Sequence, residues 1–88
     1  MKYRIEFRAS ARRDFKKLRM DVQQQIAPVI DALATNPRPS GVVKMEGKGD
    51  FYRVRCGDYR IVYDIQDGVL LVLVVKVAKR GDVYKKRK

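Results

Sequence analysis

The chain has 88 residues, with 21 Lys and Arg against 10 Asp and Glu, so its formal net charge is +11. This length predicts a single domain over residues 1–88, and 45% hydrophobic residues are enough to give it a compact core. One cysteine excludes an internal disulfide framework, and the lack of histidine excludes Cys/His metal sites and His-based acid–base catalysis.

The charge and the hydropathy pattern indicate where the protein works and what it contacts. A surplus of eleven positive charges attracts polyanions, so nucleic acid is the expected partner and an acidic protein is the second candidate. The longest apolar run has seven residues, too short to span a membrane, and residues 1–8 lack the apolar block of a signal peptide. We therefore expect a cytoplasmic protein with no membrane association and no cofactor.

The first half of the chain is predicted to form a strand and two helices. Apolar residues alternate with charged ones over residues 3–7, which is the period of a half-buried strand. Residues 11–18 and 22–33 have helical apolar spacing, with Ser10 and Asp21 as the candidate N-caps. The short connection between the two helices predicts an αα-hairpin packed against a sheet.

From residue 42 onward the apolar period changes to two, which predicts a four-stranded antiparallel meander. Residues 69–77 are apolar on both faces apart from Lys76, which places this strand inside the sheet, with residues 1–7 as a candidate neighbour. The predicted fold is α+β, with an N-terminal strand and an αα-hairpin packed on a small antiparallel sheet. The meander strands are expected at residues 42–45, 51–56, 59–66 and 69–79, separated by turns at 47–50, 57–58 and 67–68.

The hairpin around Gly57-Asp58 carries the main candidate site. A two-residue loop there pairs Arg55 with Arg60, and side-chain alternation places Arg53 on the same face, opposite the core. Like charges opposed across a ladder destabilise a sheet, and Asp64 is the obvious acidic candidate to neutralise them. One guanidinium group can bind two phosphate oxygens at once, and it keeps its positive charge at physiological pH. This face is therefore predicted to bind a phosphate.

Other polar and aromatic residues could extend this site. Arg80 and Tyr84 follow the last predicted strand; a tyrosine ring can stack on a base, and a phenolate can accept a proton. Residues 85–88 are expected to form a flexible basic tail, and Cys56 is expected to project into the core as a small buried hydrophobe. The further predicted nucleic-acid contacts are Lys44, Lys76 and Lys79.

At these residues the sequence resembles the RelE toxins, within the RelE/ParE superfamily of toxin–antitoxin pairs, over nearly the whole chain. Residues 3–7 are similar to the family's first strand, and residues 11–18 to its first helix. Residues 50–63 are similar to the central hairpin, and residues 79–84 to the closing motif, in which a lysine–arginine pair precedes an acidic residue, Val and Tyr. The resemblance implies a small antiparallel sheet with two N-terminal helices.

The resemblance also implies an activity, because RelE toxins enter the ribosomal A site and cut the mRNA there. In the implied reaction the ribose 2′-OH attacks the adjacent phosphate, leaving a 2′,3′-cyclic phosphate and a 5′-OH. Arg60, Arg80 and Tyr84 match the family's catalytic arginines and tyrosine. Arg53 and Arg55 occupy two positions that are often held by lysine.

The implied roles of the arginines are electrostatic. Arg60 and Arg80 would stabilise the charge that develops on the phosphoryl oxygens and the leaving group, while Arg53 and Arg55 would hold the scissile phosphate. Arginine effectively cannot release its proton, so it cannot replace a lysine that serves as the general base. The candidates for that base are Tyr84, Lys76, Lys79, a water molecule or the ribosome itself.

The family also implies partners, and other functions remain open. The implied partners are the ribosome, mRNA and an acidic RelB-like antitoxin, of which a long amphipathic segment could cover the helices or the arginine-bearing face. A ParE-type toxin would share the fold but poison DNA gyrase, and such toxins generally lack the full set of arginines and tyrosine. A non-catalytic RNA-binding module would use the same basic face for phosphate contacts alone.

Overall fold

The structure is a computed structural model that describes residues 2–45 and 51–79. The predicted turn at 47–50, the predicted site residues Arg80 and Tyr84, and the basic tail at 85–88 lie outside the described residues. In chain order the elements are β1 (Arg4–Phe7), α1 (Ala9–Lys16), α2 (Met20–Ala32), β2 (Val43–Lys44), β3 (Phe51–Cys56), β4 (Tyr59–Gln66), a short 3-10 helix η1 (Asp67–Val69) and β5 (Leu71–Lys79).

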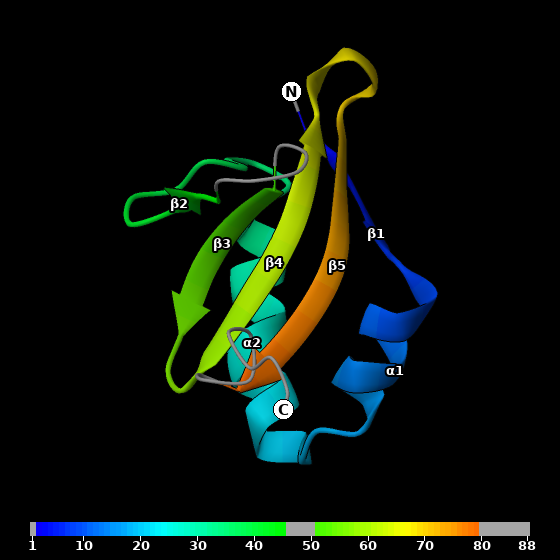
Figure 1. The fold of residues 1–88 in the computed structure, drawn as a ribbon, viewed down its shortest axis with the longest axis vertical. Helices are drawn as coiled ribbons and strands as arrows, with labels where there is room; N and C mark the ends of the chain where they lie inside the picture. The colour runs from blue at the N-terminus through cyan, green and yellow to red at the C-terminus, as the bar shows by residue number, and fades with distance from the viewer. Residues whose placement is uncertain (1, 46–50, 80–88) are drawn as a thin grey trace.

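The strands form one sheet in the order β1-β5-β4-β3-β2, which confirms the predicted α+β fold (Figure 1). The last four strands form the predicted antiparallel meander. β1 lies beside β5 but runs parallel to it, with Arg4 opposite Leu71 and Phe7 opposite Val74. The sheet is therefore mixed. A parallel pair needs a long crossover connection, and here the two helices and strands β2 to β4 supply it.

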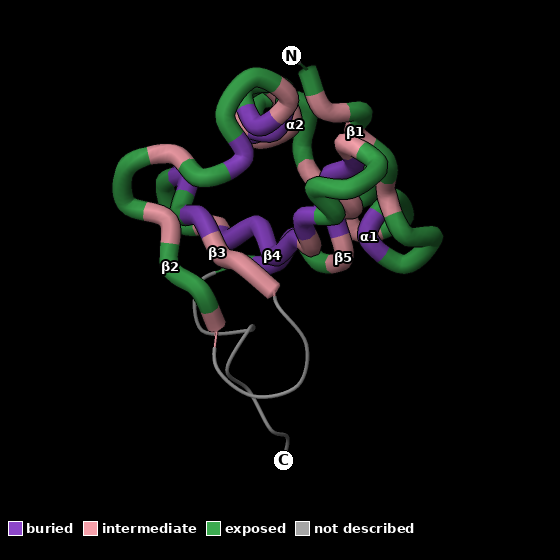
Figure 2. Tube along the Cα trace, turned by 90° about the horizontal axis from the view of Figure 1, so that it is seen from above, coloured by how far each residue is buried: buried purple, intermediate pink, exposed green. Residues whose placement is uncertain are grey.

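Both helices contribute to one core, which lies on one face of the sheet. α2 lies across β3 and β4, and α1 lies beside β5 (Figures 1 and 2). Cys56 is buried, as predicted; its thiol donates a hydrogen bond to the Gln25 carbonyl oxygen at 3.5 Å, and burial raises the pKa of the thiol. The largest fully buried side chains are Tyr63, Ile26, Leu33, Ile61, Val72 and Val74.

The two helices begin without the predicted side-chain caps. Arg8 and Arg19 occupy the N-cap positions and make no capping hydrogen bond through their side chains, so the prediction of Ser10 and Asp21 as caps is wrong. The start of α1 is set by the sheet instead, since the Arg8 N–H still donates to the Val74 carbonyl oxygen at 2.8 Å. Of the helices that the structure describes, none is long and apolar enough to cross a membrane.

The connection between β4 and β5 is longer than the predicted two-residue loop. η1 is followed by Leu70, which has a φ of +52°, so β5 begins at Leu71. The Leu70 N–H donates to the Asp67 carbonyl oxygen at 3.2 Å and closes the turn. The Asp67 side chain binds Arg38 and Tyr3, which are distant in the chain, and this favours a turn that the local sequence does not specify.

A β-bulge interrupts the ladder between β4 and β5. Val62 pairs with Lys76, and the next pair along the ladder joins Tyr63 to Val74. Val75 is therefore an extra residue on β5. In a regular ladder Lys76 would share the face of the core side chains; the bulge moves it to the other face of the sheet.

Gly57 closes the β3–β4 hairpin in a conformation that favours glycine. Its φ is +59°, and a Cβ atom there would lie 2.6 Å from Gln25 Nε2. We expect Gly57→Ala to lower the free energy of unfolding by about 1–2 kcal/mol, because the left-handed conformation crowds Cβ against the following carbonyl oxygen. Urea denaturation followed by circular dichroism measures the change. Gly68→Ala is the matched control, since Gly68 has open space around it; an equal loss in both variants would contradict the expectation.

Candidate nucleic-acid interface

The β3–β4 hairpin has the predicted register. Arg55 lies opposite Arg60, and Arg53 lies opposite Val62. The side chains that alternate with them belong to the core, so these residues share the opposite face of the sheet. The bulge adds Lys76, which is the partner of Val62 on β5. We call the set Arg53, Arg55, Arg60 and Lys76 the arginine face.

The arginines of this face differ in exposure. Arg55 is exposed and Arg53 is half-buried, but Arg60 is only 8% exposed, so the prediction of a surface guanidinium group is wrong at Arg60. β4 is an inner strand, and Arg60 lies between Arg55 on one side and Ala78 on the other. A buried guanidinium keeps its charge, and the lower local dielectric strengthens its attraction for an anion that reaches it.

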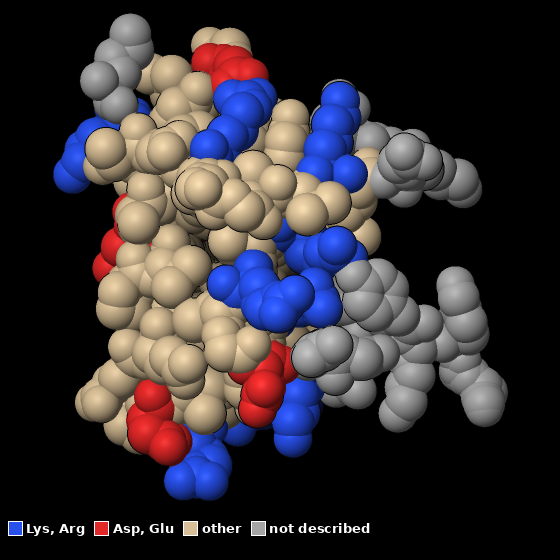
Figure 3. Space-filling model, turned by 90° about the vertical axis from the view of Figure 1, so that its left-hand side faces the viewer, with Lys and Arg blue, Asp and Glu red and all other residues tan. Residues whose placement is uncertain are grey.

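The structure separates the lysines that were predicted as nucleic-acid contacts. Lys76 belongs to the arginine face. Lys44 pairs with Tyr52 and Lys79 pairs with Tyr59, so both occupy ladder positions on the core face, at an edge strand and at the end of β5. All of these lysines are exposed, and their role in binding stays a prediction. Figure 3 shows Lys and Arg side chains gathered near the middle of the side of the molecule formed by β2 and β3.

Asp64 lies on the same face of the sheet as the arginines, because it alternates with Arg60 and Val62 along β4. It lies two residues beyond Val62, opposite Phe51 and Leu73. Its carboxylate accepts a hydrogen bond from Gln66 Nε2 at 3.0 Å, and within the described parts of the chain it forms no ion pair. The interpretation of this face as a phosphate site stays a prediction.

A cluster around Asp67, which the sequence analysis missed, joins segments that are far apart in the chain. The Arg38 guanidinium donates to both Asp67 carboxylate oxygens, at 2.9 and 3.3 Å, and the Tyr3 hydroxyl donates to the same carboxylate at 2.5 Å. The guanidinium also lies over the Tyr52 ring, 5.3 Å from its centroid. These contacts fix the segment at residues 36–42, which leads to β2. No local motif marks them, because each partner is distant in sequence.

This cluster should make stability depend on pH. Hydrogen bonds from Arg38 and Tyr3 lower the pKa of Asp67 below its ordinary 3.8. The stabilisation is present above that ordinary pKa and is lost as the pH falls through the lowered value. We expect the free energy of unfolding to decrease below about pH 4, and to decrease less in Asp67→Asn. Urea denaturation across this range measures it, with Asp58→Asn as an exposed control; the same pH dependence in Asp67→Asn and wild type would contradict the expectation.

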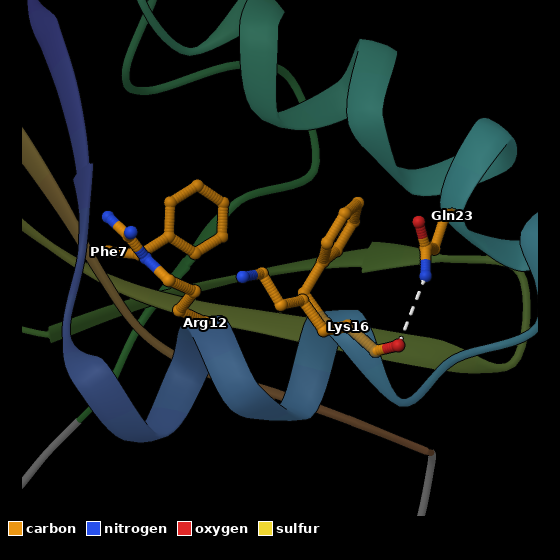
Figure 4. Close-up of a pocket in the computed structure, with 5 residues that line it drawn as sticks. Phe7, Arg12, Lys16 and Gln23 are labelled. Carbon is orange, nitrogen blue, oxygen red and sulfur yellow. Dashed lines mark hydrogen bonds between the residues drawn. The ribbon is translucent and has the colours of Figure 1, made fainter.

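An apolar groove lies on the core side of the sheet, away from the arginine face. Phe7 and Phe15 form its floor, with ring centroids 6.0 Å apart, and Arg12 and Lys16 lie beside the rings (Figure 4). Gln23 of α2 borders the groove and donates from Nε2 to the Lys16 carbonyl oxygen at 3.4 Å. The hollow measures about 410 Å³, and a second one of about 320 Å³ shares the same two phenylalanines. The first hollow is thus apolar at its floor and positively charged at its rim, while Asp31 lines the second one.

Comparisons with known proteins agree with this architecture. A family model described as the ParE toxin of the type II toxin–antitoxin system parDE matches residues 5–84. The crystal structure of an archaeal RelE–RelB complex from Pyrococcus horikoshii OT3 contains a chain that superposes with a TM-score of 0.80 at 29% identity, covering 92% of this chain and 98% of that chain.

Two curated relatives are similar over almost the whole length. A protein of Escherichia coli named as a RelE-like toxin is 37% identical, over 96% of this chain and 92% of the relative. The mRNA interferase toxin RelE of Escherichia coli K12 is 31% identical, with the same coverage of both chains. With the matching family model and the shared fold, these identities show that the chain belongs to the RelE family of toxins from type II toxin–antitoxin systems.

Proposed function

We propose that this toxin is a ribosome-dependent endoribonuclease that cuts mRNA in the ribosomal A site and so inhibits translation. The observation that carries the proposal is the pairing of Arg55 with Arg60 on a face that also holds Arg53 and Lys76. Clustered guanidinium groups suit a phosphodiester, because each can bind two of its oxygens. The relative that is named an mRNA interferase toxin, at 31% identity, also supports the proposal.

The proposed reaction depends on holding a phosphate and stabilising charge. The ribose 2′ oxygen loses its proton and attacks the adjacent phosphorus, and the bond from phosphorus to the 5′ oxygen breaks. That oxygen takes a proton, so the products are a 2′,3′-cyclic phosphate and a 5′-OH. Arg53 and Arg55 would hold the phosphate, and Arg60 would stabilise the charge that develops on its oxygens. Arg80 would act on the leaving group, and Tyr84 would stack on a base or assist proton transfer.

We propose Lys76 as the first candidate for the general base. An arginine cannot accept this role, because it does not release its proton, whereas a lysine can. Of the lysines predicted to contact nucleic acid, Lys76 is the one that shares the face of Arg55 and Arg60, through the bulge in β5. Tyr84, Lys79, a water molecule and the ribosome itself are the alternatives.

A primer-extension assay on a defined mRNA, with ribosomes present and absent, tests the proposed activity. We expect cuts within A-site codons when ribosomes are present and intact mRNA when they are absent. Intact mRNA under both conditions, with translation proceeding normally, would contradict the proposal.

A ParE-type activity is the second candidate, because the matching family model is that of the ParE toxin. It would inhibit DNA gyrase and leave mRNA intact. A gyrase supercoiling assay with the purified toxin separates the two functions. We expect normal supercoiling; inhibition of supercoiling without mRNA cleavage would replace the nuclease proposal with this one.

We also propose that an acidic RelB-like antitoxin binds this toxin in the cytoplasm. The similar chain from Pyrococcus horikoshii is in a RelE–RelB complex, and the net charge of +11 attracts an acidic partner. The groove would take an amphipathic segment, with apolar side chains on Phe7 and Phe15 and acidic ones beside Arg12 and Lys16. Neither of these cations forms an ion pair with a described residue. Because complementary charge speeds encounter, association should slow as salt rises.

A further inference from the structure

The last part of β5 has an open edge beside α1. β1 pairs with β5 only from Leu71 to Val74. Beyond that point, in the part of the chain that the structure describes, β5 is paired on one side only, by β4. α1 lies beside this stretch of β5, so the open edge and the helix border a common space (Figure 1).

A hollow of about 330 Å³ occupies this space. Lys17 comes from the end of α1, and Lys76 and Lys79 come from β5. Asp14 is the acidic residue in the lining, and none of these charged side chains forms an ion pair with a described residue. The hollow therefore has a surplus of positive charge that is not neutralised within the described structure.

An aromatic ring completes the lining. Tyr59, at the start of β4, packs against the core and also borders the hollow. It is half-buried, and its hydroxyl makes no hydrogen bond with a described residue. An aromatic ring beside lysines is the combination with which proteins bind single-stranded nucleic acid, since the ring stacks on a base and the cations follow the backbone.

The hollow continues the arginine face around the edge of the sheet. Lys76 lines the hollow and also belongs to the arginine face, and Ala78, another lining residue, lies directly opposite Arg60. Neighbouring strands are about 4.8 Å apart, so the hollow begins one strand away from Arg60. An RNA strand whose phosphate lies on the arginine face must continue beyond it, and this hollow offers the next charged and aromatic surface.

We propose that this hollow binds one nucleotide of single-stranded RNA beside the cleaved phosphodiester, with Tyr59 stacked on the base and Lys17 and Lys79 at its phosphate. The inference rests on the proposed nuclease function and adds two residues, Tyr59 and Lys17, to the substrate path. RNA is favoured over an acidic polypeptide because the hollow is continuous with the arginine face, whereas the apolar groove lies elsewhere.

Binding of a short fluorescent RNA to the full chain tests this subsite without requiring cleavage. The RNA carries a 2′-deoxy nucleotide at the position to be cut, and fluorescence anisotropy measures its affinity. We expect Tyr59→Leu to weaken binding about tenfold and Tyr59→Phe to change it less than about twofold, because the ring supplies the stacking. Lys17→Ala should reduce the slope of log affinity against log salt by about 0.7, the contribution of one phosphate contact. Lys2→Ala, an exposed lysine on β1's side of the molecule, should leave the slope unchanged.

An abasic scan of the same RNA identifies the nucleotide. Removing one base beside the cut position should weaken wild-type binding about tenfold and have little further effect in Tyr59→Leu. Circular dichroism checks that Tyr59→Leu is folded. If it is not folded, the subsite is tested by the abasic scan of the wild type and by the salt dependence of RNA binding in Lys17→Ala. Equal losses at every abasic position, or equal salt slopes for Lys17→Ala and Lys2→Ala, would overturn the subsite.

Two outcomes separate the subsite from the wider proposals. If Lys17→Ala weakened binding of poly-glutamate but left RNA binding unchanged, the hollow would be a site for an acidic polypeptide and the proposal would be overturned. If the wild type failed to cut mRNA on ribosomes, the proposed function would fail, while the RNA-binding results would still confirm or refute the subsite by themselves.

Discussion

Arg55→Ala is expected to slow ribosome-dependent mRNA cleavage by about 100-fold or more, the usual effect of removing one preorganised donor from a developing charge. Arg55 is exposed and lies opposite Arg60 across the hairpin ladder, so its guanidinium can reach a phosphate at the surface without supporting the core. A time course of primer extension on ribosome-bound mRNA measures the rate. Circular dichroism should show an unchanged fold.

Two further variants sharpen this experiment. Arg13→Ala removes the same charge from the exposed side of α1 and should change the rate less than about twofold. Arg55→Lys keeps the charge but loses bidentate contact, so its rate should lie between those of wild type and Arg55→Ala. Arg60→Ala is less informative, because removal of a buried side chain also lowers stability. A wild-type rate in Arg55→Ala would leave the arginine face as a binding surface without a catalytic role.

Phe15→Ala is expected to weaken antitoxin binding by about 30-fold or more, because loss of a buried aromatic anchor at an interface costs about 2 kcal/mol or more. Phe15 forms the floor of the groove together with Phe7. The variant should still cut mRNA, since the groove lies on the core side of the sheet and the arginine face lies on the other. In cells it would therefore escape neutralisation and stay toxic. Titration calorimetry with the cognate antitoxin measures the affinity.

The double charge reversal Arg12→Glu/Lys16→Glu tests the rim of the same groove independently of its floor. Both side chains are exposed, so the fold should persist. The association rate should fall by about tenfold at low salt and converge toward the wild-type rate at high salt. The matched control is the double charge reversal Arg13→Glu/Lys17→Glu, which changes the net charge equally at two neighbouring residues that do not line the groove. Equal effects of the two reversals would show that only the net charge matters, and wild-type affinity in Phe15→Ala would place the antitoxin elsewhere.

The hairpin register was predictable because it depends on local chemistry. Gly57-Asp58 has the composition of a two-residue loop, and that loop alone sets Arg55 opposite Arg60. The same reasoning failed at the next turn, because Asp67 binds Arg38 and Tyr3 and a longer connection results. A local pattern specifies a turn only when no distant side chain competes for its polar groups.

The candidate site was predictable in its location and less so in its details. Lys76 shares the arginine face only because Val75 is an extra residue in β5. A bulge of this kind cannot be predicted from a continuous apolar sequence. Arg60 is buried, and it lies on an inner strand whose position depends on the strand order. The groove between Phe7 and Phe15 was missed because both residues have the spacing of ordinary core side chains.

The parallel pairing of β1 with β5 joins the first and the last strands to be synthesised among the described elements. β1 leaves the ribosome first, but its partner strand is synthesised last among the described elements, after about 3–13 s at ordinary elongation rates. Until then β4 lacks the strand that pairs Ala78 with Arg60, and Lys76 has not yet been added to the arginine face. The arginine face is therefore completed only once β5 has been synthesised, so a nascent chain that ends before Lys76 lacks one of its four cations.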